Sequence, residues 1–160
     1  MARSDLSEEL ITAGRRLVAA TDDLGLQAQG AMWLYSYALE DWRFYLVTSL
    51  VDTLGRRRTY RMLLDAFEAV ELPQSLTVED VHLGSPTDPF FGLVAGAVSV
   101  SGDSVARFVD CQFNGVPFDG VVYRMMREPP SAKEAQKIEK RFTKRVRDAV
   151  DAHAKALHTR

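Results

Sequence analysis

Apolar residues recur with two periods along the chain, and the changes between these periods divide it into helices and strands. From Ser4 to Asp23, and again from Asp52 or Thr53 to just before Pro73, apolar residues return every three or four positions, as on one face of a helix. Thr87-Asp88-Pro89 combines a helix cap with proline at the first helical position and predicts a helix to about Val98. Ser131 should cap a last helix that runs to about Leu157.

Segments rich in aromatic and β-branched residues lie between these helices and are typical of strands. We expect one hairpin from residues 29–37 and 42–50, a short strand at 78–83, and a second hairpin from 105–113 and 116–125. Asn114-Gly115 is a strong two-residue turn signal, and it pairs Phe113 with Val116 and Cys111 with Phe118. The order α-β-β-α-β-α-β-β-α predicts an α+β fold, with a mainly antiparallel sheet of about five strands and helices packed on it.

The composition is that of a globular protein, and charge is distributed unevenly along the chain. The 160 residues, 46% of them hydrophobic, suit one globular domain. Residues 1–130 hold 11 arginines and 18 acidic residues, a net charge of −7, whereas residues 131–160 hold 9 basic and 4 acidic residues, a net charge of +5. We therefore predict a single α+β domain over residues 1–128 and a long basic C-terminal helix within residues 129–160.

The chain carries few features that point to a compartment. No apolar run approaches the length of a membrane span, and the opening MARSDLSEEL is not typical of a secretory signal. One cysteine, Cys111, cannot form an internal disulfide. We expect a cytoplasmic protein of bacterial type that does not associate with membranes.

Candidate catalytic groups are sparse. His82 stands in the short strand far from other histidines, and Cys111 is expected to be a small apolar residue inside the second hairpin. Asp110 and Asp119 face each other if Asn114-Gly115 is the whole turn, and such a pair could hold a hard cation. A bulge or a longer turn would separate them, and we favour that reading. Neither phosphate-loop pattern occurs, so we expect no cofactor, no metal site and no catalytic residue.

Basic residues form two clusters. The first stands near the start of the second helix, the unfavourable end for positive charge, and the second surrounds the last helix. Both are candidates for contact with an anion or a nucleic acid, and a solvated helix face is the simpler alternative. The candidates are Arg56, Arg57, Arg58, Arg61, Lys137, Lys140, Arg141 and Lys144.

Two apolar features suggest a protein partner. The first hairpin is apolar on both faces, and the last helix has a narrow seam that resembles a heptad pattern. Three destinations for that helix stay open: its own acidic domain, another protein or a second copy, and nucleic acid. The partner-binding candidates are Trp33, Tyr35, Trp42, Ile138, Phe142 and Val146.

Several stretches resemble a family of small uncharacterised bacterial proteins: Ala31-Met32-Trp33-Leu34-Tyr35, Trp42-Arg43-Phe44-Tyr45-Leu46-Val47-Thr48, Val51-Asp52 with Gly55 and Tyr60, Gly84-Ser85-Pro86 with Asp88, and Val122-Tyr123-Arg124. The resemblance spans about residues 8–126. It implies a bacterial cytoplasmic setting and no activity that can be assigned to a residue.

The function predicted from the residues is a protein-interaction or self-association module without catalytic activity. A nucleic-acid accessory protein is the alternative, and a hydrolytic or metal-dependent enzyme comes last.

Overall fold

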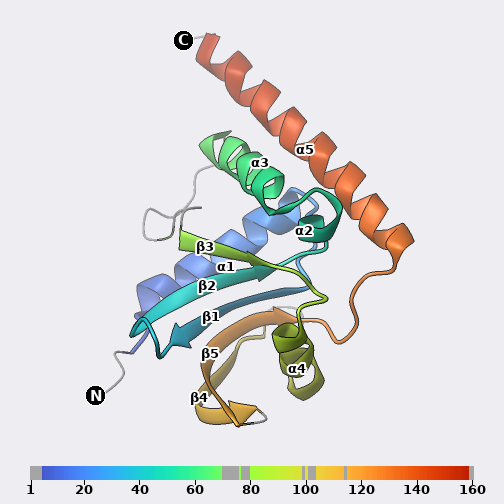
Figure 1. The fold of residues 1–160 in the computed structure, drawn as a ribbon. Coiled ribbons are helices and arrows are strands. Elements are labelled where there is room, and N and C mark those ends of the chain that lie inside the picture. The colour runs from blue at the N-terminus through green and yellow to red at the C-terminus, as the bar shows by residue number, and fades with distance from the viewer. Residues whose placement is uncertain are drawn as a thin grey trace.

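The computed structural model describes residues 5–69, 76, 80–98, 100, 104–113 and 115–158. These residues form five helices and one five-stranded sheet, so the α+β class is confirmed (Figure 1). The helices are α1 (Glu8–Asp23), α2 (Leu50–Thr53), α3 (Arg56–Ala69), α4 (Pro89–Ala97) and α5 (Ala132–His158). The strands are β1 (Gly30–Ser36), β2 (Asp41–Val47), β3 (Val81–Gly84), β4 (Ala106–Phe113) and β5 (Val116–Met125).

The sheet has the order β3-β2-β1-β5-β4 and is mixed. The prediction of a mainly antiparallel sheet is corrected by β3, which pairs with β2 in parallel. The reason lies in the connection, because α2 and α3 carry the chain back to the end of the sheet at which β2 began. The two hairpins are antiparallel, and β1 joins them by pairing with β5.

The second predicted helix begins later than expected, and a short helix precedes it. The helix expected to follow a cap at Asp52 or Thr53 begins at Arg56 as α3, whereas α2 occupies Leu50–Thr53 and is separated from α3 by Leu54 and Gly55. Gly55 has a φ of +87°, a conformation that glycine adopts at little cost and that ends a helical turn. The four arginines that follow therefore stand in the first turns of a new helix.

Helices cover both faces of the sheet (Figure 1). On one face, α1, α3 and α5 contribute to a core that includes Leu17, Phe44, Leu63 and Phe142. On the other face, the shorter α4 packs over a second cluster through Phe91, Val94 and Val98, against Met32, Val47 and Val122 of the sheet. Both faces of β1 and β2 are thus covered for much of their length, which explains why these strands are apolar on both sides.

The predicted helix ends are largely confirmed. The hydroxyl of Ser7 accepts a hydrogen bond from Leu10 N, the carboxylate of Asp88 from Phe90 N, and the hydroxyl of Ser131 from Glu134 N. Gly25, with a φ of +78°, follows the last turn of α1. Ser4, where the first helix was expected to begin, and Asn114 of the second turn lie outside the described residues.

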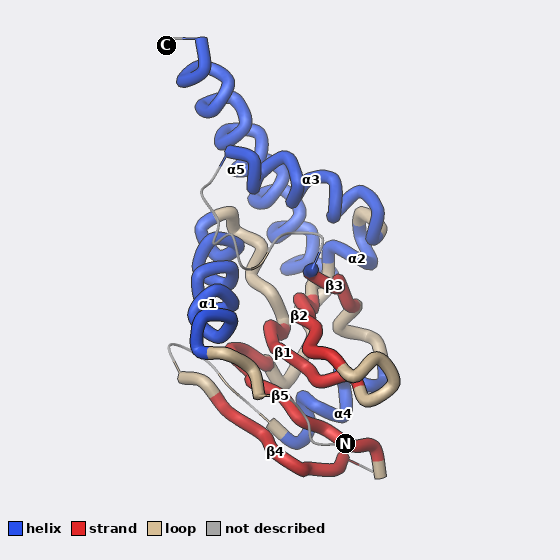
Figure 2. Tube along the Cα trace, turned by 90° about the vertical axis from the view of Figure 1, so that its left-hand side faces the viewer, coloured by secondary structure: helices blue, strands red, loops and turns tan. Residues whose placement is uncertain are grey.

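The last helix packs along its own chain for part of its length. Its first half lies beside α3, and both views show its C-terminal end extending past the remaining helices (Figures 1 and 2). The side chains that it buries are Ala135, Ile138, Phe142 and Val146. Of the three destinations left open, packing on its own chain accounts for this half, and the proposed boundary between residues 128 and 129 stays a prediction. None of the described helices has the length and apolar character to cross a membrane.

Candidate functional site

A group of aromatic side chains stands at the free end of the first hairpin. The ring of Tyr35 meets that of Tyr37 at 5.1 Å and that of Trp42 at 5.5 Å, both nearly edge to face. Tyr37 is 48% exposed, and Leu39 in the same turn is 57% exposed. We call Tyr35, Tyr37, Leu39 and Trp42 the hairpin patch. It offers apolar surface and two phenol groups to solvent, next to a well-packed strand pair.

The register of the hairpin places this patch. Tyr35 lies directly opposite Trp42, and the turn at residues 37–40 begins after Ser36, so the ring of Tyr37 folds back onto Tyr35. Glu40 adopts a φ of +51°, which reverses the chain. The sequence singled out Tyr35 and Trp42 but missed Tyr37 and Leu39. Their position just beyond a strand end was the available signal, because apolar residues in a tight turn have little core to enter.

Trp33 points the other way, into the core. It is buried, its indole N–H donates to the carbonyl of Leu10 in α1 at 3.2 Å, and its ring meets Phe44 edge to face. A buried indole with a satisfied N–H is a structural group. Trp33 is thus not accessible to a partner, in contrast to the expectation from sequence.

The apolar seam of α5 also serves the core. Ile138, Phe142 and Val146 are all buried against the same cluster as Leu17 and Leu63. A partner could reach them only if α5 left the domain. The seam was predicted to bind a partner, but in the structure it packs on the chain's own body, because a narrow apolar stripe specifies burial and not the identity of the covering surface.

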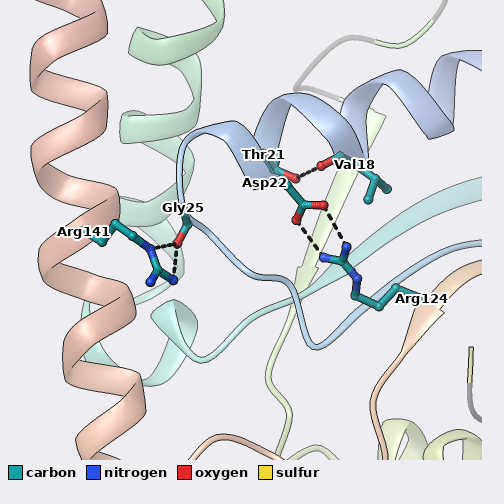
Figure 3. Close-up of polar contacts among 6 residues, drawn as sticks. All are labelled: Val18, Thr21, Asp22, Gly25, Arg124 and Arg141. Carbon is teal, nitrogen blue, oxygen red and sulfur yellow. Dashed lines mark hydrogen bonds and ion pairs between the residues drawn. The ribbon is translucent and has the colours of Figure 1, made fainter. Parts of the chain in front are cut away.

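Two basic residues of α5 bind the end of α1. The guanidinium of Arg141 donates from Nε and from a terminal nitrogen to the carbonyl of Gly25, at 3.2 and 3.1 Å (Figure 3). Arg145 donates to the carbonyl of Asp23 at 3.1 Å. Carbonyls at a helix C-terminus lack partners within the helix and carry partial negative charge, so a cation there is favourable. Arg141 therefore has a structural role, whereas Lys137, Lys140 and Lys144 remain exposed.

The four arginines near the start of α3 also differ in the contacts that they make. Arg56 uses its Nε to donate to the carbonyl of Leu83 in β3, at 3.1 Å. Arg57, Arg58 and Arg61 are exposed on the helix surface. Within the part of the chain that the structure describes, Arg56 is the one of these four arginines with a hydrogen bond to another element.

The two aspartates of the second hairpin do not form a cation site. The predicted pairs Cys111–Phe118 and Phe113–Val116 are confirmed, but the register shifts between Phe108 and Cys111. Asp110 sits in this bulge with a φ of +53°, and its backbone N–H donates to the carboxylate of Asp119 at 2.6 Å. The carboxylate of Asp119 is buried and serves the bulge, whereas Asp110 is exposed. Within the described residues, no group of three potential metal-binding side chains gathers.

His82 lies in β3 and Cys111 lies in β4, and their side chains contact different groups. The ring nitrogen Nε2 of His82 lies 2.8 Å from a terminal nitrogen of Arg43, whose guanidinium can only donate. Burial, and then the charge of Arg43, lower the pKa of His82, while Asp80 opposes them. Cys111 is half-buried, and its thiol approaches the carbonyl of Val109 in its own strand. The imidazole of His82 is thus held by Arg43, and the thiol of Cys111 lies in another strand.

No family model matches the chain, no curated protein is similar to it, and no solved structure resembles it. The resemblance to a bacterial family over residues 8–126 therefore stays a prediction. The function has to be argued from the contacts and the chemistry of the chain itself.

Proposed function

We propose that the protein is a non-catalytic interaction module that associates through the hairpin patch, with a second copy of the chain as the first partner to test. The observation that supports the proposal is the exposure of Tyr37 and Leu39, by 48% and 57%, beside two further rings in mutual contact. Tyrosine and tryptophan are enriched at the centres of protein interfaces, because they bury much apolar surface and keep a polar atom for hydrogen bonding.

The rest of the chain agrees with this proposal. The residues that could have formed a competing apolar interface, Ile138, Phe142 and Val146, are already buried. Tyr35 and Trp42 are half-buried, so their rings are held in place and lose little conformational freedom on binding. A rigid aromatic pair flanked by two exposed apolar side chains is the arrangement expected of a small binding surface.

Sedimentation velocity tests the proposal directly. The full chain should form dimers in a concentration-dependent way, and the double variant Tyr37→Ser, Leu39→Ser should sediment as a monomer at the same concentrations. The matched control is Val109→Ser, which removes a similarly exposed apolar side chain from β4 and should leave association unchanged. Equal behaviour of the two variants would place the contact elsewhere.

A monomeric wild type at every concentration would exclude self-association and leave a different protein as the partner. A photo-crosslinking amino acid in place of Tyr37 then identifies neighbours in the cell, with the same substitution at Val109 as the reference. Cross-links at position 37 that do not exceed those at position 109 would contradict the proposal.

One observation favours nucleic acid as the second candidate. Five basic side chains of α5 line a shallow hollow of about 530 Å³ on the helix surface, Asp148 being the acidic residue at its edge. Phosphate contacts release counterions, so binding to a short RNA or DNA should weaken steeply as salt rises. Fluorescence anisotropy of the wild type and of Lys140→Gln, Lys144→Gln tests this, because both lysines are exposed and their loss should not disturb the fold. The basic side chains are Lys137, Lys140, Arg141, Lys144 and Arg145.

A further inference from the structure

A hollow of about 380 Å³ opens between α4 and the adjoining face of the sheet. It lies on the face of the sheet that α4 covers, whereas Trp42 of the hairpin patch packs against the core of the opposite face. Its volume falls at the lower end of the range for small-molecule sites. Tyr35 of the hairpin patch also borders this hollow, but the proposed interaction function does not use the hollow itself.

Aromatic rings give the hollow its apolar character. Phe91 and Phe118 are buried, and Tyr45 and Phe90 are half-buried at its sides. Phe91 holds the rings together, since its centroid lies 5.4 Å from that of Phe90 and 6.0 Å from that of Tyr45. Gly84 allows this packing, because a Cβ there would lie 2.4 Å from the ring of Phe91. A planar apolar ligand would find ring faces and edges already in place.

Arg56 supplies the charge. Arg56 is exposed and lines the hollow, and a hydrogen bond from its Nε to the carbonyl of Leu83 holds the side chain in place. Among the described residues, the partner of Arg56 is this neutral carbonyl and not a carboxylate, so its positive charge is not neutralised by an ion pair. Guanidinium groups bind carboxylates through parallel hydrogen bonds.

Two carboxylates also line the hollow, and each accepts a hydrogen bond from the backbone. Asp88 lines the same hollow, but its carboxylate caps α4 by accepting from Phe90 N at 2.9 Å. The partial positive charge of the helix N-terminus offsets the charge of this carboxylate. Asp119 also borders the hollow, yet its carboxylate accepts from the backbone of Asp110 in the neighbouring strand. Arg56 is thus the positively charged side chain that lines the hollow, whereas Asp88 and Asp119, which keep their negative charge, are held at the helix N-terminus and at the bulge.

We propose that this hollow binds a small aromatic carboxylate, with the ring against Tyr45, Phe90 and Phe91 and the carboxylate on the guanidinium of Arg56. The ring and the carboxylate of the ligand each contact a different part of the hollow. The ring replaces water on apolar surface, and the carboxylate pairs with an arginine that is already oriented.

Isothermal titration calorimetry with benzoate, and with benzyl alcohol as its neutral counterpart, tests the proposal. Benzoate should bind at least about tenfold more tightly, the factor expected for one charge-assisted hydrogen-bonded pair. Arg56→Gln should remove this preference and leave benzyl alcohol unaffected, since glutamine keeps an N–H donor for Leu83. Arg58→Gln is the matched control, because this exposed arginine stands two residues away and does not line the hollow.

The ring contacts need a separate variant. Phe90→Leu keeps an apolar side chain and should weaken benzoate and benzyl alcohol by a similar factor. Amide chemical-shift changes in the wild type provide a test that depends on no variant, and they should concentrate at Gly84, Phe90 and Phe91.

Three results would overturn the proposal. The first is the absence of benzoate binding to the wild type, and the second is equal affinity for benzoate and benzyl alcohol. The third is an equal effect of Arg56→Gln and Arg58→Gln, which would indicate general attraction of anions to α3. The hairpin patch is unchanged in all these variants, so a failure here leaves the interaction proposal standing.

Discussion

The guanidinium of Arg124 in β5 donates two parallel hydrogen bonds to the carboxylate of Asp22 in α1, each 2.7 Å long (Figure 3). These hydrogen bonds raise the pKa of Arg124 above its usual value. The pair ties the last turn of α1 to the sheet, and a few residues further on, Arg141 and Arg145 tie the end of the same helix to α5. The C-terminus of α1 is thus the point at which three parts of the chain meet.

Removing the arginine of this pair should destabilise the fold. We expect Arg124→Met to lower the free energy of unfolding by about 2 kcal/mol, since a partly buried carboxylate would lose two charge-assisted hydrogen bonds. Urea unfolding measures the loss, and Arg127→Met, which removes a nearby exposed arginine, is the control. A loss in the Arg124 variant no larger than in the control would show that the pair contributes no net stability.

Alanine substitutions at Gly25 and Gly55 should distinguish the stability cost of backbone strain from the cost of a steric clash. Gly25 and Gly55 both have positive φ, but a Cβ at Gly25 would lie 2.7 Å from the side chain of Arg141, whereas one at Gly55 would meet nothing within 4 Å. Gly55→Ala should therefore cost about 1 kcal/mol from conformation alone. Gly25→Ala should cost more, because Arg141 has to move from the carbonyl that it binds. Thermal unfolding of both variants checks the order, and the reverse order would contradict the contact.

The place of α5 in the core gives a third prediction. Phe142 is fully buried, so Phe142→Ala should lower the free energy of unfolding by about 3–5 kcal/mol. Leu157→Ala, in the exposed last turns of the same helix, should change it by less than about 0.5 kcal/mol. Similar small effects from both substitutions would mean that α5 does not stay packed on the domain in solution.

Acidic conditions should weaken the fold through His82. Because burial and Arg43 lower the pKa of His82 below its usual value of 6.5, the unfolded chain binds a proton at this residue more readily than the folded chain does. The contribution of His82 to stability is complete above pH 6.5 and is lost as the pH falls through the lower folded pKa. The free energy of unfolding should fall less steeply below pH 6.5 in His82→Gln than in the wild type, and His158→Gln, at the exposed end of α5, should keep the wild-type dependence.

Much of the secondary structure was predictable because it depends on neighbours in the sequence. The caps Ser7, Asp88 and Ser131 act within one helical turn, and the pairing of Cys111 with Phe118 follows from a turn only a few residues away. The break at Gly55 is equally local, but glycine occurs within helices as well as at their ends, so the sequence did not reveal that a short α2 precedes α3.

The candidate sites were less predictable because a residue type specifies a kind of contact and not its partner. Arg56 and Arg141 were both recognised as candidates for binding an anion, yet Arg141 binds the end of α1, whereas Arg56 binds a carbonyl of β3 and lines the hollow beside α4. Asp110 and Asp119 were expected to be separated if the strand bulged. The structure adds that one of them holds the bulge through its carboxylate.

The sequence by itself determined the α+β class, the positions of most helices and strands and the apolar seam of the last helix, since each follows from a short-range period or a local cap. Only the tertiary structure decided that β3 runs parallel to β2, that Trp33 and Phe142 lie in the core and that Tyr37 and Leu39 stand outside it. These features depend on which surfaces meet across distant parts of the chain. The spacing of apolar residues shows that one face of a helix or strand will be buried, but tertiary packing determines which other part of the chain buries it.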